Sequence, residues 1–219
     1  EERARFECLL ADISARFVGS PAGDVDAEIA CALDGIRRFF QVDQIAFLKY
    51  EADSAYIVHP SHWLAADGVV AVPTDSDGRL LFPWIHDQLR SGDPLILLGE
   101  DLPPEAGADR ESFARFGIRA AVAVPLLEQQ GTPQYLLCLA ALRSVRQWTA
   151  DIVVRLRLLG EIFVQALLRR QADQELRAAE LTYHTLADFS ADWDYWQDAE
   201  RGFRYMSPSC EEITGYSRE

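Results

Sequence analysis

Apolar residues follow two spacings along the chain, and the two spacings divide it into predicted helices and strands. Apolar positions three or four apart, which share one face of a helix, open the chain at Phe6, Leu10 and Phe17. Turn residues around Pro21 interrupt this spacing, and it returns after Asp24, an N-cap residue type, to end near Phe40. The first part of the chain is therefore predicted to form two amphipathic helices.

Continuous apolar runs with β-branched residues predict the strands. These runs lie at 44–50, 55–58, 69–72, 95–98, 118–127 and 135–142. Both faces of the last run are apolar, because Leu137 and Leu139 alternate with Leu136 and Cys138. A strand that is apolar on both faces has to be covered on both faces, so helices are expected on both sides of the sheet. Short helices at 82–89 and 111–116 supply part of that cover, and Gly117 ends the second of them.

A long helix is predicted from Thr149 to about Asp188. Thr149 is a good N-cap residue, and no Pro or turn cluster interrupts the segment that follows. Its first half is heavily apolar, whereas its second half keeps only a thin apolar seam, made of Leu168, Ala172, Leu176, Ala179 and Tyr183. A narrow seam of this kind predicts a parallel two-chain linker, and a solvated single helix is the alternative.

Composition narrows the classes of partner. The chain has 219 residues with 35 acidic and 21 basic side chains, a net charge of −14. Nucleic acids and anionic membranes bind clustered positive charge, and this acidic chain shows no such cluster. Neither is therefore expected as a partner. No apolar run approaches the ~20 residues that span a bilayer, so no membrane insertion is expected. Cysteines at 8, 31, 138 and 210 form no C-x-x-C motif, which favours a reduced, cytoplasmic protein. The chain does not begin with Met, and we expect it to be part of a longer protein.

Three short segments carry a resemblance to a known family. They are the Gly117-Ile118-Arg119 entry, the Val124-Pro125-Leu126 strand end, and the link at 143–148 into the last helix. Together they resemble a GAF domain, a sensor module of bacterial signalling proteins. The resemblance implies an α/β fold, more closely an α+β sandwich, over residues 1–166. It would have a mostly antiparallel sheet of about six strands, helices on both faces and a long C-terminal linker helix.

The end of the chain resembles a second sensor family. Residues 192–196 and 203–206 predict a hairpin, and a helix is expected to start at Ser207-Pro208. This order resembles the beginning of a PAS domain. We therefore expect a helical signalling linker at 167–188 and a truncated PAS-like fragment at 189–219, too short for a complete core. The resemblances imply an output domain in the same chain, of histidine kinase or diguanylate cyclase type.

Specialised ligands and metals are not favoured. The Pro-x-Ser-Asp-Ile-Pro motif of bilin-binding modules and the Asn-Lys…Phe…Asp-Glu signature of cyclic-nucleotide modules are both absent. His59 and His62 lack a third ligand, so no metal site is predicted. His184 precedes PAS-like sequence, which argues against a phosphoacceptor role. No cofactor is identified, and an unknown noncovalent small molecule is the expected ligand.

Catalysis is not expected of this chain. No nucleophile elbow or Gly-rich phosphate loop is present, and no catalytic residue is assigned. The GAF resemblance brings one remote enzymatic alternative, a methionine sulfoxide reductase that uses pocket cysteines. Cys138 lacks the additional cysteines that such chemistry uses to resolve its oxidised intermediate.

Two functions remain open. The first is a sensory module that binds a small molecule and relays a signal through a dimeric linker helix. The second is a ligand-free dimerisation and relay scaffold. By resemblance and alternation, the candidate pocket residues are Phe47, Tyr56, Trp63, Trp84, Ile85, His86, Ala121 and Ala123. The two terminal helices carry more apolar residues than one sheet can bury. We therefore predict a homodimer interface at Phe6, Leu10, Phe17, Ile152, Leu156 and Phe163.

Overall fold

A computed structural model of the chain describes residues 1–19, 25–49, 62–68, 78–127, 133–145, 148–189, 192–200 and 202–217. The chain forms two compact units, Glu1–Leu168 and Arg169–Glu219. The boundary between them falls within the long helix α6 (Ala150–Asp188). No helix in these described ranges combines the length and the hydropathy needed to cross a bilayer.

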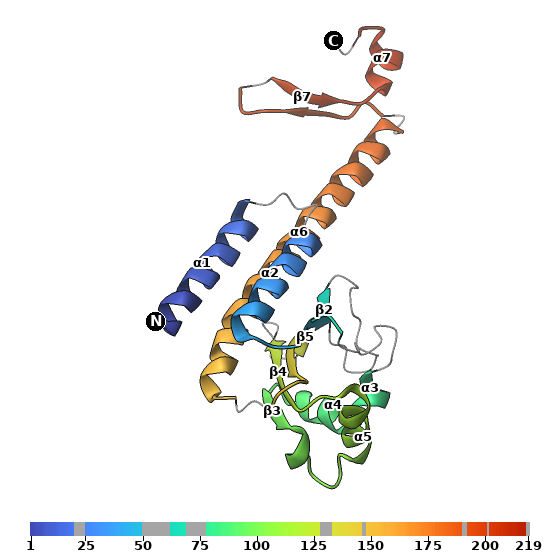
Figure 1. The fold of residues 1–219 in the computed structure, drawn as a ribbon. Coiled ribbons are helices and arrows are strands. Elements are labelled where there is room, and N and C mark those ends of the chain that lie inside the picture. Colours follow the sequence, from blue (N-terminus) through green and yellow to red (C-terminus); the bar gives the residue numbers. More distant parts are fainter. Residues whose placement is uncertain are drawn as a thin grey trace. The chain divides into compact units, whose positions relative to one another are not determined.

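The first unit is built around a five-stranded sheet with the order β2-β1-β5-β4-β3 (Figure 1). In chain order the strands are β1 (Gln44–Lys49), β2 (Trp63–Ala65), β3 (Leu95–Leu98), β4 (Ala120–Leu127) and β5 (Pro133–Ala141). All the described pairings are antiparallel, and β5 lies between β1 and β4. The predicted antiparallel sheet with helices on both faces is therefore confirmed.

The strand predictions differ from the structure in detail. The runs at 44–50, 95–98, 118–127 and 135–142 are confirmed, with small shifts at their ends. The predicted strands at 55–58 and 69–72 lie outside the described residues. Strand β2 was not predicted, because a strand of three residues is too short to show an alternating pattern.

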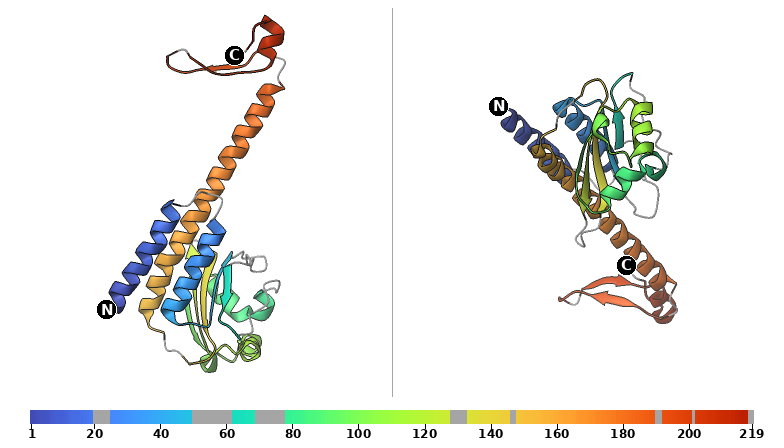
Figure 2. Two further views of the ribbon diagram at one scale, coloured as in Figure 1. Left: turned by 45° about the horizontal axis from the view of Figure 1, so that its top comes forward. Right: turned by 90° about the horizontal axis from the view of Figure 1, so that it is seen from below.

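One face of the sheet is covered by α1 (Glu2–Gly19), α2 (Val25–Phe40) and the first half of α6, which lie side by side (Figure 2). We call this the helix face. Its core combines large side chains from alternate strand positions with one stripe of each helix. The ring of Phe163 lies 5.4 Å from that of Phe47 in the sheet and 5.7 Å from that of Phe17 in α1.

The residues predicted to form a dimer interface lie inside this same core. Phe6, Ile152, Leu156 and Phe163 are buried within one chain, and Leu10 and Phe17 pack against the cluster. They are therefore not the unused apolar surface from which the interface was predicted. The reason is that α1 packs against α6 of its own chain, as the 2.8 Å ion pair between Glu2 and Arg155 also shows.

Helix α6 approaches the sheet closely at Gly160. A Cβ atom at this position would lie 2.5 Å from Cδ1 of Leu126 and 3.2 Å from its Cγ. The missing side chain lets the helix backbone lie directly on β4. The position of α6 on the helix face is thus set by a contact that any larger residue would change.

The opposite face of the sheet is covered by shorter elements, and we call it the pocket face. These are α3 (Gly78–Leu81), α4 (Pro83–Leu89), η2 (Gly99–Asp101) and α5 (Gly107–Phe116). The buried carboxylate of Asp109 in α5 accepts hydrogen bonds from the backbone N–H groups of Trp84 and Ile85, at 3.1 and 3.0 Å. It therefore caps the start of α4 and ties two helices of this cover together. Gly117 ends α5 with φ 69°, as predicted.

The second unit contains the rest of α6, a hairpin of β6 (Tyr195–Gln197) and β7 (Phe203–Met206), and α7 (Ser209–Thr214). The predicted hairpin and the helix that follows it are confirmed. Gly215 ends α7 with φ 74°. Trp193 and Trp196 are each 42% exposed and Phe203 is 53% exposed, so this unit buries its aromatic residues poorly.

Candidate functional site

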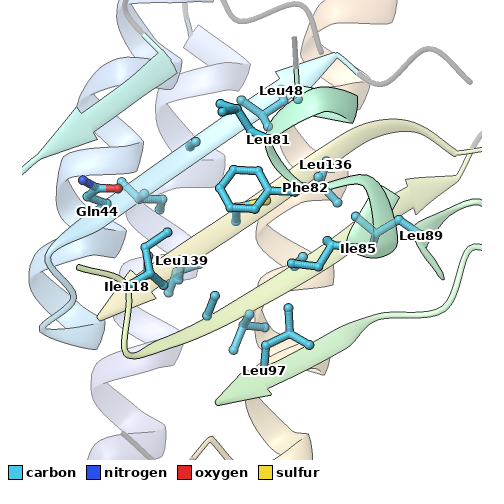
Figure 3. A pocket seen from close by; sticks show the side chains of 18 of the residues that line it. Gln44, Leu48, Leu81, Phe82, Ile85, Leu89, Leu97, Ile118, Leu136 and Leu139 are labelled. Atoms are coloured by element: carbon cyan, nitrogen blue, oxygen red, sulfur yellow. The ribbon is translucent and has the colours of Figure 1, made fainter. Parts of the chain in front are cut away.

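The candidate site is a pocket between the sheet and the helices of the pocket face (Figure 3). Its volume is about 130 Å³. Strands β1, β3, β4 and β5 form the floor, while α3, α4 and α5 form the roof. These strands are apolar on both faces, so helices cover both faces of the sheet. One face is packed against its helices, and the other encloses the pocket.

Small side chains make the floor of the pocket. The register aligns Ala46 of β1, Cys138 of β5 and Ala123 of β4 in one row across the three central strands. A neighbouring row contains Ala140 of β5 and Ala121 of β4 beside Gln44 of β1. Because these side chains are short, the space above the middle of the sheet is left open.

Larger side chains bound this floor. Leu48 of β1 pairs with Leu136 of β5, two residues along the strands from the pair of Ala46 and Cys138. On the other side of β1, Trp63 of β2 pairs with Ala46. The roof and the remaining walls come from the covering helices, from β3 and from residues just outside these elements, namely Leu81, Phe82, Ile85, Leu89, Leu97, Phe113 and Ile118. Figure 3 shows most of these side chains around the opening, with the ring of Phe82 among them.

Polar groups are few in this wall. Among the described lining residues none carries a charge, and Gln44 is the one with an amide side chain. Gln44 is buried and has an interaction of its own within the chain. The indole Nε1 of Trp63 is buried and meets no acceptor among the described residues. The described wall of the pocket is therefore almost entirely apolar.

Cys138 places a thiol in the floor of the pocket. Burial in these apolar surroundings raises the pKa of the thiol to about 12. The residue is half-buried, and its side chain packs on the pocket side of the sheet. The thiol is therefore neutral at physiological pH, which disfavours its use as a nucleophile.

The structure divides the predicted pocket residues into groups. Trp63, Ile85, Ala121 and Ala123 line the pocket. Phe47 lies on the helix face instead, where its ring stacks on that of Tyr135 at 5.2 Å.

The remaining predicted residues do not line the pocket within the described part of the chain. Trp84 packs beside the cluster around the pocket, and His86 is buried in α4 without being among the lining residues. Tyr56 lies outside the described residues.

Sequence reasoning missed most of the floor and the roof. Ala46, Leu48, Leu136, Cys138 and Ala140 follow from a signal that was available, the alternation of β1 and β5. Once Ala121 and Ala123 are placed on the pocket face, the strand register assigns their cross-strand partners to the same face. The roof residues Leu81 and Phe82 carry no such signal, because they lie at the end of the four-residue helix α3 and at the break before α4.

The histidines do not form a metal site in the described part of the chain. Nε2 of His62 lies 3.3 Å from Oδ1 of Asp26, in the first turn of α2. His59 lies outside the described residues. Among those described, no group of three His, Cys, Asp or Glu residues is placed to hold a metal ion.

Comparisons with known proteins bear on this fold. The model of the GAF domain family matches residues 24–167. Among curated proteins, none matches the chain. Among solved structures, the chain is similar to the phycoerythrobilin-bound GAF domain from a cyanobacterial phytochrome, with a TM-score of 0.61 and 15% identity, covering 78% of this chain and 99% of that one.

Two further structures illustrate the range of relatives. The blue-light absorbing form of the PixJ GAF domain of Thermosynechococcus elongatus has a TM-score of 0.56 and 16% identity, covering 74% of this chain and 94% of that one. The free methionine-R-sulfoxide reductase of Neisseria meningitidis, solved with its substrate, has a TM-score of 0.56 and 16% identity, covering 79% and 94%. At these identities the likeness is one of fold.

Proposed function

Because residues 24–167 make this chain a member of the GAF domain family, we propose that it is a sensory module that binds a small molecule and passes a signal on through α6. The observation that carries the proposal is the position of the pocket. Its floor includes the central strand β5, and β5 leads through a short link into α6, which packs on the other face of the same sheet.

In addition to the strand pairing, the side chain of Asp43 links the start of β1 to the end of β5. Oδ2 of Asp43 accepts hydrogen bonds from the backbone N–H groups of Leu142 and Arg143, at 2.7 and 3.0 Å. Asp43 directly precedes Gln44, a pocket residue. This contact supports the proposal, because it links β1 of the pocket to the residues that lead into α6.

The size of such a response is bounded by thermodynamics. A ligand biases α6 only if it binds two arrangements of the pocket with different affinities, and by no more than the difference. The packing of β5 and α6 in one core supports such a relay, and measured coupling is its test.

An enzymatic function is not proposed. One fold relative is a methionine sulfoxide reductase. The cysteine in this pocket has a pKa raised to about 12, whereas attack on a substrate needs a thiolate. Other relatives are bilin-bound, but a pocket of about 130 Å³ without charged lining among the described residues favours a smaller, noncovalent ligand.

The alternative is a ligand-free relay scaffold. It predicts that side chains fill the interior on both faces of the sheet. The helix face fits that description, whereas the pocket face keeps an open space above its small residues. This space supports the sensory function over the scaffold.

Replacing Ala121 with Trp tests the proposal, because the larger ring fills the pocket floor. We expect the full-length protein to lose its response to signal while keeping its fold. Ala114→Trp, on the exposed side of α5, is the matched control. A normal response from Ala121→Trp would favour the scaffold.

We propose further that the module works as a cytoplasmic homodimer. The predicted seam on α6 supports this, since Leu176 is 59% exposed and Tyr183 is 51% exposed. Leu176→Glu should then lower the sedimentation coefficient to that of a monomer. Leu181→Glu, on another side of the same helix and 69% exposed, should leave it unchanged. Equal behaviour of the two variants would remove this seam as the interface.

We also propose that the second unit is the beginning of a PAS-like domain in a bacterial signalling protein with a kinase or cyclase output. The hairpin and helix in the expected order support this. Its exposed aromatic residues fit a fragment that lacks most of its sheet. Limited proteolysis should therefore cut first between residues 186 and 219, and full resistance there would contradict the incomplete fold.

A further inference from the structure

The chemistry of the pocket wall restricts the ligand further than its position does. We propose that the pocket binds a neutral, hydrocarbon-like molecule of about one ring, which is held by apolar contacts alone. This inference rests on the proposed sensory function and names the class of ligand for the same site. It is carried by the access of solvent to the pocket floor, the volume of the pocket and the apolar character of its described lining.

Solvent reaches the floor of the pocket, although the floor lies in the middle of the sheet. Ala121, Cys138 and Ala140 line the pocket from the central strands β4 and β5, and all three are only half-buried. Leu137 and Val124, which alternate with them and face the packed helices, are each 0% exposed. The accessible surface of the small residues therefore lies on the pocket side, where a molecule can enter from solvent.

Volume limits the size of the ligand. An apolar cavity of about 150 Å³ lined by Leu, Ile and Phe side chains accommodates benzene. The pocket here measures about 130 Å³ and has a similar lining, with Leu48, Phe82 and Ile85 around its opening (Figure 3). One ring with a short substituent fits that space, and a tetrapyrrole or a nucleotide does not.

The side chains of the described wall offer little to a polar ligand. None of them is charged, and the amide of Gln44 already has an interaction within the chain. The thiol of Cys138, whose pKa is raised to about 12, is neutral and a weak hydrogen-bonding group. The indole Nε1 of Trp63 is buried, with almost no surface that a ligand can reach. The ligand therefore meets a wall of carbon atoms over most of its surface.

The backbone of the floor is also in use. Strands β1, β4 and β5 each pair with a neighbour on both sides, so their N–H and C=O groups are taken up in the sheet. A ligand hydroxyl in this space loses its hydrogen bonds to water without replacement, and an ion loses its hydration without meeting an opposite charge. Water itself is poorly held, because a buried water needs about two to four polar partners. The pocket therefore favours an apolar molecule over both water and polar ligands.

Three probes of similar size separate apolar binding from polar recognition. Toluene is a hydrocarbon, phenol has nearly the same shape but carries a hydroxyl that stays protonated at neutral pH, and benzoate is charged. Ligand-observed NMR titration of the whole chain at neutral pH gives the three dissociation constants. We expect phenol to bind at least about fivefold more weakly than toluene, and benzoate at least about a hundredfold more weakly.

Two substitutions in the floor place toluene in this pocket. Ala123→Leu fills the floor and should abolish toluene binding. Ala121→Val adds less volume and suits a strand, and it should weaken toluene binding by at least about fivefold. Ala114→Leu, on the exposed side of α5, is the matched control and should leave toluene binding unchanged. Ala121→Val keeps the proposal testable if Ala123→Leu does not fold.

The outcomes separate this inference from the proposed function. Phenol or benzoate binding as tightly as toluene overturns the proposed ligand class. Failure of toluene to bind the wild-type chain, or toluene binding that neither floor substitution weakens, overturns it as well. The sensory function fails in a different way: toluene binds as expected, but the full-length protein with Ala121→Trp keeps its response.

Discussion

The two faces of the central sheet use the same strands in opposite ways. On the helix face, β1 and β5 present Phe47, Leu137 and Leu139 to three packed helices. On the pocket face, the neighbouring positions are Ala46 and Cys138, and a space of about 130 Å³ stays open above them. Each buried methylene adds about 0.8 kcal/mol to the free energy of unfolding. The pocket face, with its small side chains and open space, therefore stabilises the fold less than the helix face does.

This difference shows how a small domain can combine a rigid scaffold with an open site. The helix face is closed by large side chains from residues far apart in sequence, including Phe6, Leu33 and Phe163. The pocket face is closed by shorter elements held by single contacts such as the Asp109 cap. Substitutions that enlarge or remove side chains should therefore have different consequences on the two faces.

The largest loss is expected from Phe163→Ala. The side chain is fully buried among Phe17 and Phe47, and removal of such a ring costs about 3–5 kcal/mol. Leu158→Ala on the same helix is the control, since Leu158 is 43% exposed and should cost less than about 1 kcal/mol. Urea unfolding measures both. Equal losses would mean that the helix face is not the main source of stability.

A smaller loss, of about 1–3 kcal/mol, is expected from Asp109→Ala, because two buried N–H groups at the start of α4 lose their acceptors. The roof of the pocket should loosen with it, and a small apolar probe such as benzene should bind more weakly. Asp87→Ala, on the exposed side of α4, should change the free energy of unfolding by less than about 0.5 kcal/mol. Unaltered probe binding in Asp109→Ala would separate the cap from the pocket.

Gly160→Ala tests the close approach of α6 to the sheet. The added methyl meets Leu126, and overpacking of this kind costs about 1–3 kcal/mol, while the better helix propensity of Ala returns about 1 kcal/mol. A net loss of about 1 kcal/mol is expected. In a Leu126→Ala background the same substitution should be neutral or stabilising. An additive double mutant would show that the two residues do not meet.

The smallest effect concerns pH and Cys138. Its folded pKa, about 12, lies above its usual value of 9.0, so the thiol contributes stability that is complete below the unfolded pKa. This contribution is lost as the pH rises from about 9 toward 12, because the unfolded thiol ionises first. Between about pH 8 and about pH 9.5, the free energy of unfolding of the wild type should fall by up to about 1 kcal/mol more than that of Cys138→Ala. Parallel pH profiles would contradict the burial of this thiol.

Much of this contrast was present in the sequence. The alternation of Leu136 and Cys138 with Leu137 and Leu139 predicted which side chains share a face. It did not predict which face would be open, since both faces are apolar and the covering helices come from distant segments. For that reason Phe47 was expected in the pocket, although its neighbours Ala46 and Leu48 are the ones that line it.

Long-range packing was the other limit of sequence reasoning. Leu156 and Phe163 were expected at a dimer interface because one sheet did not need so many apolar residues. The structure shows that α1 takes up this surface within the same chain, which no local pattern indicates. Gly160 is similar, because a single glycine in a helix carries no signal of the Leu126 side chain that it faces.

The central claim is that one face of the sheet is packed and the other is open, and xenon tests it most directly. Xenon enters dry apolar cavities and perturbs the methyl groups that line them. Carbon-13 spectra of alanine methyl groups, recorded under xenon pressure, sample both faces at once. We expect shifts at Ala46, Ala121 and Ala123 and none at Ala32, which lies in the core of the helix face. Shifts at Ala32 as large as those of the floor alanines, or no shift at the floor, would contradict it.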